Sequence, residues 1–336
     1  MQRTVLCWTM LGLLLGARVE SGSGRTVVEL SPHERVLVEE VRHLAATLAP
    51  TVWADWPSEF PPFVLRTRGH EILIGHPHPP SGFVALPREH SVWARATTDT
   101  GDVQATYPVN GVATAVMSAP RATDDPAIWV LKAAHEVFHC YQGTARIRNP
   151  LVGRFAVYDD LSFPYPYDDP TQTAGLRLEA EVVFGLATAA ANDAAFLASQ
   201  GRLLPLVWRL QRAVSSEPEF HDYKLFTEWS EGVARYTERE LARLAATPGR
   251  YRPTPEFVRT FPGADYDRVF REHYGDVNMV NPIRFVGEGV RGRGGFYYLG
   301  MGKAYALDRL NPTWRTAYRQ HTLDELLEFG IERLSR

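Results

Sequence analysis

One short segment, Ala134-His135-Glu136-Val137-Phe138-His139, constrains this chain more than any other part of its sequence. Histidines four positions apart lie about 40° apart around a helix and about one turn apart along it, so in a helix both imidazoles reach one metal ion. A glutamate directly after the first histidine lies where it can hold a metal-bound water and accept its proton. The segment therefore predicts a helix with two zinc ligands, His135 and His139, and a general base, Glu136.

The residues around this segment favour a helix over positions 126–142. Asp124 and Asp125 offer an N-cap, Pro126 suits the first helical position, and Gly143 is a plausible stop. An apolar arc is expected to be buried, with the two histidines at its border, facing the edge of a cleft. Cys140 follows the second histidine but lies about 100° from it around the helix, so we expect a small packed side chain.

The composition of the 336-residue chain fits a large globular domain or two lobes with a cleft between them. The formal net charge of -3 shows no basic excess, which argues against a nucleic-acid partner. Residues 1–24, with Arg3 before an apolar run over 5–17, resemble a signal peptide, so we expect a secreted or periplasmic protein without a stable membrane span after its removal. Cys7 would leave with that peptide, and Cys140 would remain as a single thiol.

The segments before and after the metal helix predict a mixed α+β fold. Ser31 and Glu34 form a capping box that begins a helix over 32–48. Short strands are expected over 63–67, 71–74, 83–86 and 112–117. The last of these is either the edge strand that an extended peptide joins or an ordinary strand of the sheet. The later sequence predicts loops over 151–172 and 287–295. It also predicts helices over 176–197 (with a possible break at 192–193), 203–214 and 296–310.

A zinc ion held by two histidines needs at least one more protein ligand, with a position left for water or substrate. The residues after His139 contain neither the glycine nor the third histidine of the three-histidine pattern, so a distant carboxylate is the natural choice. Glu231 is one candidate, although it lies opposite the apolar stripe of its helix, as a solvated acid would. Glu179 and Glu181 are the reserve candidates.

The segment over 228–239, Glu-Trp-Ser-Glu-Gly-Val-Ala-Arg-Tyr-Thr-Glu-Arg, resembles the gluzincins, zinc peptidases whose third ligand is a glutamate on a second helix. The resemblance implies that Glu231 is the ligand and that Glu238, seven residues later on the same face, supports a ligand. It also implies that a downstream tyrosine, Tyr297 or else Tyr298, donates to the oxyanion. The Gly-x-Met-Glu-Asn segment by which aminopeptidases of this group bind a free amino terminus is absent, so the resemblance does not extend to that specificity.

These observations lead us to expect a zincin-like α+β fold. It would have a small helix-plus-sheet lobe over 25–122 and a mainly helical lobe over 123–336, with the active-site cleft between them. The expected function is that of an exported zinc metallopeptidase with one Zn²⁺ ion and a peptide or protein substrate. A secreted binding protein without turnover and a zinc hydrolase of a non-peptide amide remain the alternatives. Glu136 argues against the first, because a protein without turnover has no chemical need for a base.

Several other motifs predict no chemistry. The histidines at 70, 76, 78 and 90 lack metal-ligand spacing and are expected at the surface. Residues 287–292 match G-x-G-x-x-G, but no βαβ pattern surrounds them, which argues against a dinucleotide site. The acidic pairs within 151–172 do not have the spacing of a calcium loop and are interpreted as solvated.

Overall fold

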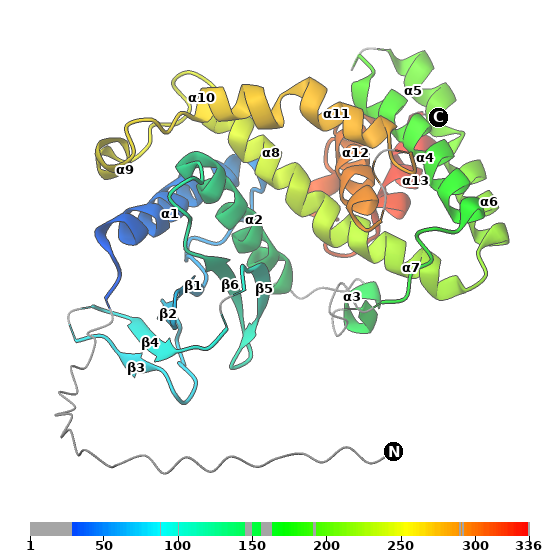
Figure 1. Cartoon of the computed structure of the whole chain (residues 1–336). Helices are drawn as coiled ribbons and strands as arrows, with labels where there is room; N and C mark the ends of the chain where they lie inside the picture. The colour runs from blue at the N-terminus through cyan, green and yellow to red at the C-terminus, as the bar shows by residue number, and fades with distance from the viewer. Residues whose placement is uncertain are drawn as a thin grey trace, which may run out of the picture.

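The computed structural model describes residues 29–87, 89–99, 101–144, 150–155, 163–190, 193–288, 290 and 292–334. Helices and one six-stranded sheet occur within these residues, which confirms the predicted α+β class (Figure 1). The predicted signal peptide and Cys7 lie outside the described residues. Within the described part of the chain, no helix is both long enough and apolar enough to cross a membrane.

The first helix, α1 (Pro32–Val52), begins at the predicted capping box. The Ser31 hydroxyl accepts a hydrogen bond from the backbone N–H of Glu34, and the Glu34 carboxylate accepts one from the backbone N–H of Ser31. The helix continues one turn beyond the predicted end at position 48, because its last residues, including Val52, still pack into the core.

The sheet has the strand order β3-β4-β2-β1-β6-β5, and only the pairing of β1 with β6 is parallel. Asn110 and Gly111 both have positive φ angles and form the tight turn between β5 and β6. The strands are β1 (Phe63–Thr67), β2 (His70–Ile74), β3 (Val84–Ala85), β4 (Val92–Ala96), β5 (Gln104–Val109) and β6 (Val112–Ser118).

Of the two alternatives for 112–117, the ordinary strand of the sheet is confirmed and the edge strand is wrong. This segment is β6, which lies between β1 and β5, whereas β5 forms the edge of the sheet. We did not predict β5, because its sequence has no run of apolar residues and contains Pro108. Proline cannot donate to a neighbouring strand, so its presence is typical of an edge.

The core lies mainly on one side of the sheet. Alternate residues of β1, such as Phe63 and Leu65, point into the large apolar cluster that includes α1 and α2 (Pro126–Thr144), the helix that carries His135 and His139. Val64 points the other way, into a small cluster with Leu73 and Val116. The side chain of Asp125 accepts from two backbone N–H groups of the first turn of α2, which confirms the predicted N-cap.

The remaining helices follow α2, and several of them gather at the end of the molecule away from the sheet (Figure 1), whereas the one over 255–260 packs against α1. They are α3 (Pro150–Phe155), α4 (Pro170–Thr188), α5 (Ala194–Gly201), α6 (Leu204–Val214), α7 (Pro218–Thr227), the π-helical turn η1 (Glu228–Gly232), α8 (Val233–Ala246), α9 (Pro255–Thr260), α10 (Tyr266–Val269), the π-helical turn η2 (Phe270–Tyr274), α11 (Asp276–Arg284), α12 (Gly294–Leu310), the 3₁₀ turn η3 (Trp314–Thr316) and α13 (Leu323–Leu334).

The segments α7, η1 and α8 form one continuous rod, which runs diagonally through the molecule in Figure 1. Its α8 part packs against α1 and α2, and its η1 part packs against α12. The rod therefore joins the sheet-bearing half of the chain to the later helices and brings the segment around Glu231 to α2.

Two predictions for the helical part need correction. The segment over 151–172 is not one loop, because α3 occupies its start and α4 begins at Pro170, where Asp169 caps the helix. The helix predicted over 176–197 is two helices, α4 and α5, and the possible break at 192–193 is close to the start of α5. The predicted helices over 203–214 and 296–310 are confirmed as α6 and α12.

His76 is buried rather than at the surface. Its Nδ1 atom accepts a hydrogen bond from the backbone N–H of His78, so its Nε2–H donates to the carbonyl oxygen of Val109. The ring thus ties the end of β2 to the turn after β5. Of the other three histidines, His78 and His90 are exposed and His70 is half-buried.

Candidate metal centre

The two histidines of α2 point toward one another across one helical turn. Their Nε2 atoms lie 3.1 Å apart, and their rings are nearly perpendicular, with centroids 4.8 Å apart. His135 is buried, whereas the side chain of His139 is 13 % exposed. The pair therefore lies at the border of the core, as the apolar arc of the helix predicts.

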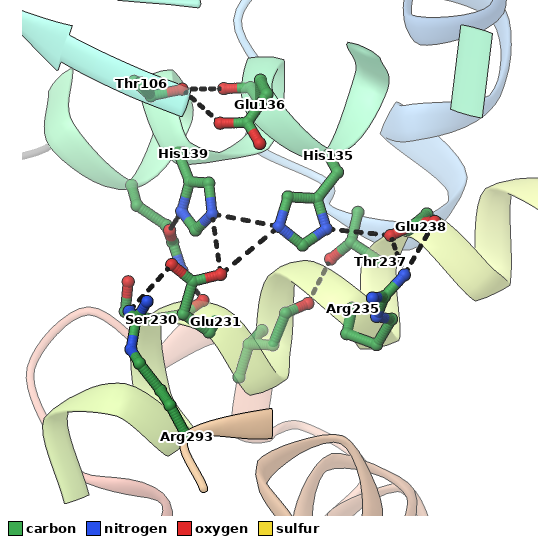
Figure 2. Close-up of polar contacts among 12 residues, drawn as sticks. Thr106, His135, Glu136, His139, Ser230, Glu231, Arg235, Thr237, Glu238 and Arg293 are labelled. Atoms are coloured by element: carbon green, nitrogen blue, oxygen red, sulfur yellow. Dashed lines mark hydrogen bonds and ion pairs between the residues drawn. The ribbon is translucent and has the colours of Figure 1, made fainter. Parts of the chain in front are cut away.

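Glu231 reaches this pair from the π-helical turn η1 (Figure 2). One of its oxygens, Oε2, lies 3.5 Å from Nε2 of His135 and 3.4 Å from Nε2 of His139. The structure thus brings together the three residues that were predicted as ligands, although about ninety positions separate the glutamate from the histidines.

The three atoms form a triangle of the size that a zinc ion requires. Four ligands arranged tetrahedrally at about 2.0–2.1 Å from zinc lie about 3.3–3.4 Å from one another. The observed separations of 3.1, 3.4 and 3.5 Å are close to this value. Two imidazole nitrogens and one carboxylate oxygen are also a donor set typical of catalytic zinc sites, so the residues fit the ion.

Each histidine uses its other ring nitrogen for a hydrogen bond that orients the ring. Nδ1 of His135 lies 2.9 Å from Oε2 of Glu238, and Nδ1 of His139 lies 2.6 Å from Oε1 of Gln142. Carboxylate and amide oxygens only accept, so both Nδ1 atoms carry a proton, and in the neutral rings that a metal ion requires both Nε2 atoms present lone pairs. Two lone pairs and an anionic oxygen then converge, an arrangement that a cation stabilises.

The groups behind the histidines are themselves held in place. Arg235 donates to both oxygens of Glu238, at 2.9 and 3.1 Å, and the hydroxyl of Tyr274 donates to Oε1 at 2.5 Å. The amide nitrogen of Gln142 donates to the backbone of Ser230 at 2.9 Å, which turns its oxygen toward His139. Glu238 therefore takes the supporting position that the resemblance implies.

Glu136, the predicted base, is buried beside the histidines. One of its oxygens lies within 4.8 Å of a nitrogen of each histidine, which is farther away than the ligand oxygen of Glu231. The hydroxyl of Thr106, on the edge strand β5, lies 3.0 Å from Oε2 of Glu136 and 2.8 Å from its backbone oxygen (Figure 2). The structure thus places the carboxylate of Glu136 next to the two histidines and in contact with Thr106.

The charges around the pair alter its pKa values in the metal-free protein. Burial lowers the pKa of His135, but hydrogen bonds with Glu231 and Glu238 outweigh that effect and raise the pKa to about 10. The pKa of His139 is also raised, since the negative charge of Glu231 outweighs burial. Burial favours the neutral form of Glu231, yet the nearby His139 and His135 hold its pKa well below the usual range. The site therefore favours positive charge between these residues.

Tyr297 is joined to the site through one arginine. It lies half-buried in the first turn of α12, and the guanidinium carbon of Arg293 lies 5.1 Å from its ring centroid. Nη2 of Arg293 lies 3.3 Å from Oε1 of Glu231, the oxygen that faces away from the histidines. The predicted role of Tyr297 as an oxyanion donor stays a prediction. Tyr298, the second choice, is also half-buried and packs against the core.

The structure does not place the reserve candidates with the histidines. The carboxylate of Glu179 is enclosed by Lys224 and Lys303, at 2.8 and 2.6 Å, and Glu181 is exposed on α4. Cys140 is fully buried, as predicted, and burial raises the pKa of its thiol to about 12.

Sequence reasoning missed several residues around the site. Gln142 lies three positions after His139, a spacing that places both on one face of a helix and that would have identified it. Arg235 likewise lies three positions before Glu238, within the segment that identified Glu231. The others reach the site from remote segments and give no local signal: Thr106, Tyr274, Arg293 and Tyr318, whose hydroxyl donates to the backbone oxygen of Trp229.

Comparison of the chain with models of known protein families, with curated proteins and with solved structures found no match.

Proposed function

We propose that this chain is an exported zinc peptidase of the gluzincin type, with a zincin-like fold and a substrate cleft between its sheet-bearing and helical lobes. One observation carries the proposal. The Nε2 atoms of His135 and His139 and one oxygen of Glu231 converge at distances of 3.1–3.5 Å, while both Nδ1 atoms are occupied by hydrogen bonds elsewhere. A cation at the centre would bind the two imidazole nitrogens and the carboxylate oxygen together, which explains why they face one another.

The residues of the site divide into ligands and a base. A zinc ion bound by His135, His139 and Glu231 would polarise a substrate carbonyl and make water acidic enough to react near neutral pH. Glu136 would accept the proton of the attacking water on its carboxylate and pass it to the leaving amine. Thr106 would hold one oxygen of that carboxylate and so fix its direction.

The position of Thr106 supports a peptide as the substrate. It lies in β5, which pairs with β6 on one side and forms the edge of the described sheet on the other. An extended peptide can pair with the backbone of such an edge strand. Because Thr106 touches Glu136, a peptide bound along β5 would pass beside the base. This geometry favours a peptide bond over a small non-peptide amide.

The experiment that tests the proposal compares the wild-type chain with Glu136→Gln. Both proteins are assayed on a chemically unfolded protein substrate, and their zinc content is measured. General base catalysis contributes about 10²- to 10⁴-fold, so we expect hydrolysis to fall by that factor while zinc is retained. The matched control is Glu256→Gln, the same change at an exposed residue of α9.

Two results would contradict the proposal. Equal hydrolysis by wild type and Glu136→Gln would reject Glu136 as the base. Zinc binding without hydrolysis of any unfolded protein or peptide by the wild type would instead favour a secreted binding protein.

A further inference from the structure

The glutamate ligand lies on an irregular turn of an otherwise regular rod. Residues of η1 follow the π-helical pattern, in which each N–H bonds five residues back, so each residue turns less about the axis than in an α-helix. Glu228 and Glu231 both belong to this turn but serve different partners. Glu231 faces the histidines of α2, whereas Glu228 is fully buried on the side of α12.

The carboxylate of Glu228 belongs to a buried cluster of five charged side chains. At its centre, Nζ of Lys303, a residue of α12, lies 2.6 Å from Glu228, 2.6 Å from Glu179 and 2.5 Å from Asp324. Lys224 completes the cluster, at 2.9 Å from Glu228 and 2.8 Å from Glu179. The cluster thus connects α4, α7, η1, α12 and α13.

The backbone of η1 lies directly against α12 at the same place. A Cβ atom added to Gly232 would lie 2.5 Å from the Cα atom of Gly300, and one added to Gly300 would collide with the backbone oxygen of Glu228. Only glycine permits this approach at either position. Gly300 and Lys303 are three residues apart on α12, so one face of that helix holds both the backbone and the side chain of Glu228.

Stability alone is a poor explanation for this cluster. Removing five ionisable side chains from water has a large unfavourable desolvation free energy, and well-packed apolar side chains are often as stabilising as a buried ion pair. In some proteins, buried charges instead specify a single geometry, because each must meet its partners. Here that geometry is imposed on the turn that carries Glu231.

We propose that Lys303 and Glu228 are positioning residues for the metal centre, which hold η1 in its π-helical form so that the carboxylate of Glu231 meets His135 and His139. The inference rests on the proposed zinc site and adds to it the means by which the third ligand is set. Neither residue touches the substrate or the ion; both act through the backbone of η1.

The test compares two variants that make the same chemical change to the cluster. Glu228→Gln and Asp324→Asn each neutralise one carboxylate that contacts Lys303, but only the first lies on the turn with Glu231. In Glu228→Gln the two lysines keep Glu179, and Lys303 keeps Asp324. Zinc affinity is measured by competition with a chromophoric chelator, and the visible spectrum of the Co²⁺-substituted protein reports the ligand geometry.

We expect Glu228→Gln to weaken zinc binding by about 10- to 100-fold, the range found when groups behind metal ligands are changed, and to alter the Co²⁺ spectrum. Asp324→Asn should keep the wild-type affinity within about 2-fold and the wild-type spectrum. Should Glu228→Gln fail to fold, Lys303→Arg, which keeps the charge but replaces a compact ammonium by a planar fork, gives the same comparison.

Three other results are informative. Wild-type affinity and spectrum in the Glu228 or Lys303 variant would overturn the positioning role. Equal loss in Asp324→Asn would also overturn it, because the cluster would then act on general stability. A wild-type chain that binds neither metal would refute the proposed zinc site itself, which separates that failure from a failure of the present inference.

Discussion

Nδ1 of His135 lies 2.9 Å from Oε2 of Glu238, a residue 103 positions later in the chain. Glu238 is fully buried, and although burial raises its pKa, the charge of Arg235 and the contact with His135 lower it more, to about 2. An ionised carboxylate therefore faces the imidazole N–H at any physiological pH. Such a partner fixes the ring and makes its other nitrogen a better metal donor.

Replacing this carboxylate should weaken metal binding. We expect Glu238→Ala to lower the zinc affinity by about 10- to 100-fold, measured by chelator competition, because the His135 ring loses its orienting partner. Glu240→Ala is the matched control, two residues later on α8, where the carboxylate contacts Arg239, Arg243 and Tyr305 instead. Equal affinities for wild type and Glu238→Ala would contradict the supporting role.

Thr106 should affect turnover but not metal content. Thr106→Val removes the hydroxyl beside Glu136, and a hydrogen bond to a charged group contributes about 1.5–3 kcal/mol, so kcat/KM on a peptide substrate should fall by about 12- to 160-fold. Thr106→Ser should restore it. The control is Thr114→Val, a change on β6 at a hydroxyl that bonds to the backbone of Val112. Full activity in Thr106→Val would show that Glu136 needs no such support.

The metal-free protein should lose stability as the pH rises. The folded-state pKa values of His135 and His139 are raised above the unfolded value of about 6.5, to about 10 for His135. Between these limits the folded chain holds protons that the unfolded chain has released. This contribution is therefore complete below pH 6.5 and is lost as the pH rises toward 10.

Zinc should show the opposite dependence, because it needs neutral imidazoles and competes with these protons. Thermal unfolding of chelator-treated protein is measured at about pH 6 and about pH 9. The Tm of the wild type minus that of His135→Gln should be smaller at the higher pH. The increase in the wild-type Tm on adding zinc should be larger at the higher pH. A metal-free protein that gains stability over this interval relative to His135→Gln would contradict the assigned pKa direction.

The close contact between η1 and α12 predicts a sharp difference between two glycines. Gly300→Ala should destabilise the protein by about 1–3 kcal/mol, because its methyl group would meet the backbone of Glu228. In Gly143→Ala, near the end of α2, the new Cβ would lie 3.6 Å from Ala113, an ordinary contact, and should be neutral or slightly stabilising. Chemical denaturation measures both, and equal stabilities would contradict the described packing.

The local sequence was sufficient to predict helices that are set by their own caps and apolar pattern. The capping box at Ser31 begins α1, and the cap at Asp125, the apolar arc and the spacing of the two histidines define α2. Glu231 required more than its helical position, since an acid opposite an apolar stripe is normally solvated. Its resemblance to a gluzincin segment separated it from Glu179, a choice with which the geometry agrees.

The features that escaped prediction depend on contacts between remote segments. The π-helical form of η1 depends on Gly300 and Lys303 of α12, and no local propensity encodes it. β5 escaped because an edge strand has few buried residues and so little apolar pattern. Tyr274 and Thr106 likewise reach the site from elements whose own sequences give no indication of a metal.

The zinc content of the purified chain, beside that of Glu231→Ala, tests the central claim most directly. Elemental analysis should find one zinc ion per wild-type chain and a loss of most of it in Glu231→Ala, since two histidines alone hold the ion weakly. A wild-type chain without zinc after growth in zinc-supplemented medium, or a Glu231→Ala chain with as much zinc as the wild type, would contradict a site formed by His135, His139 and Glu231.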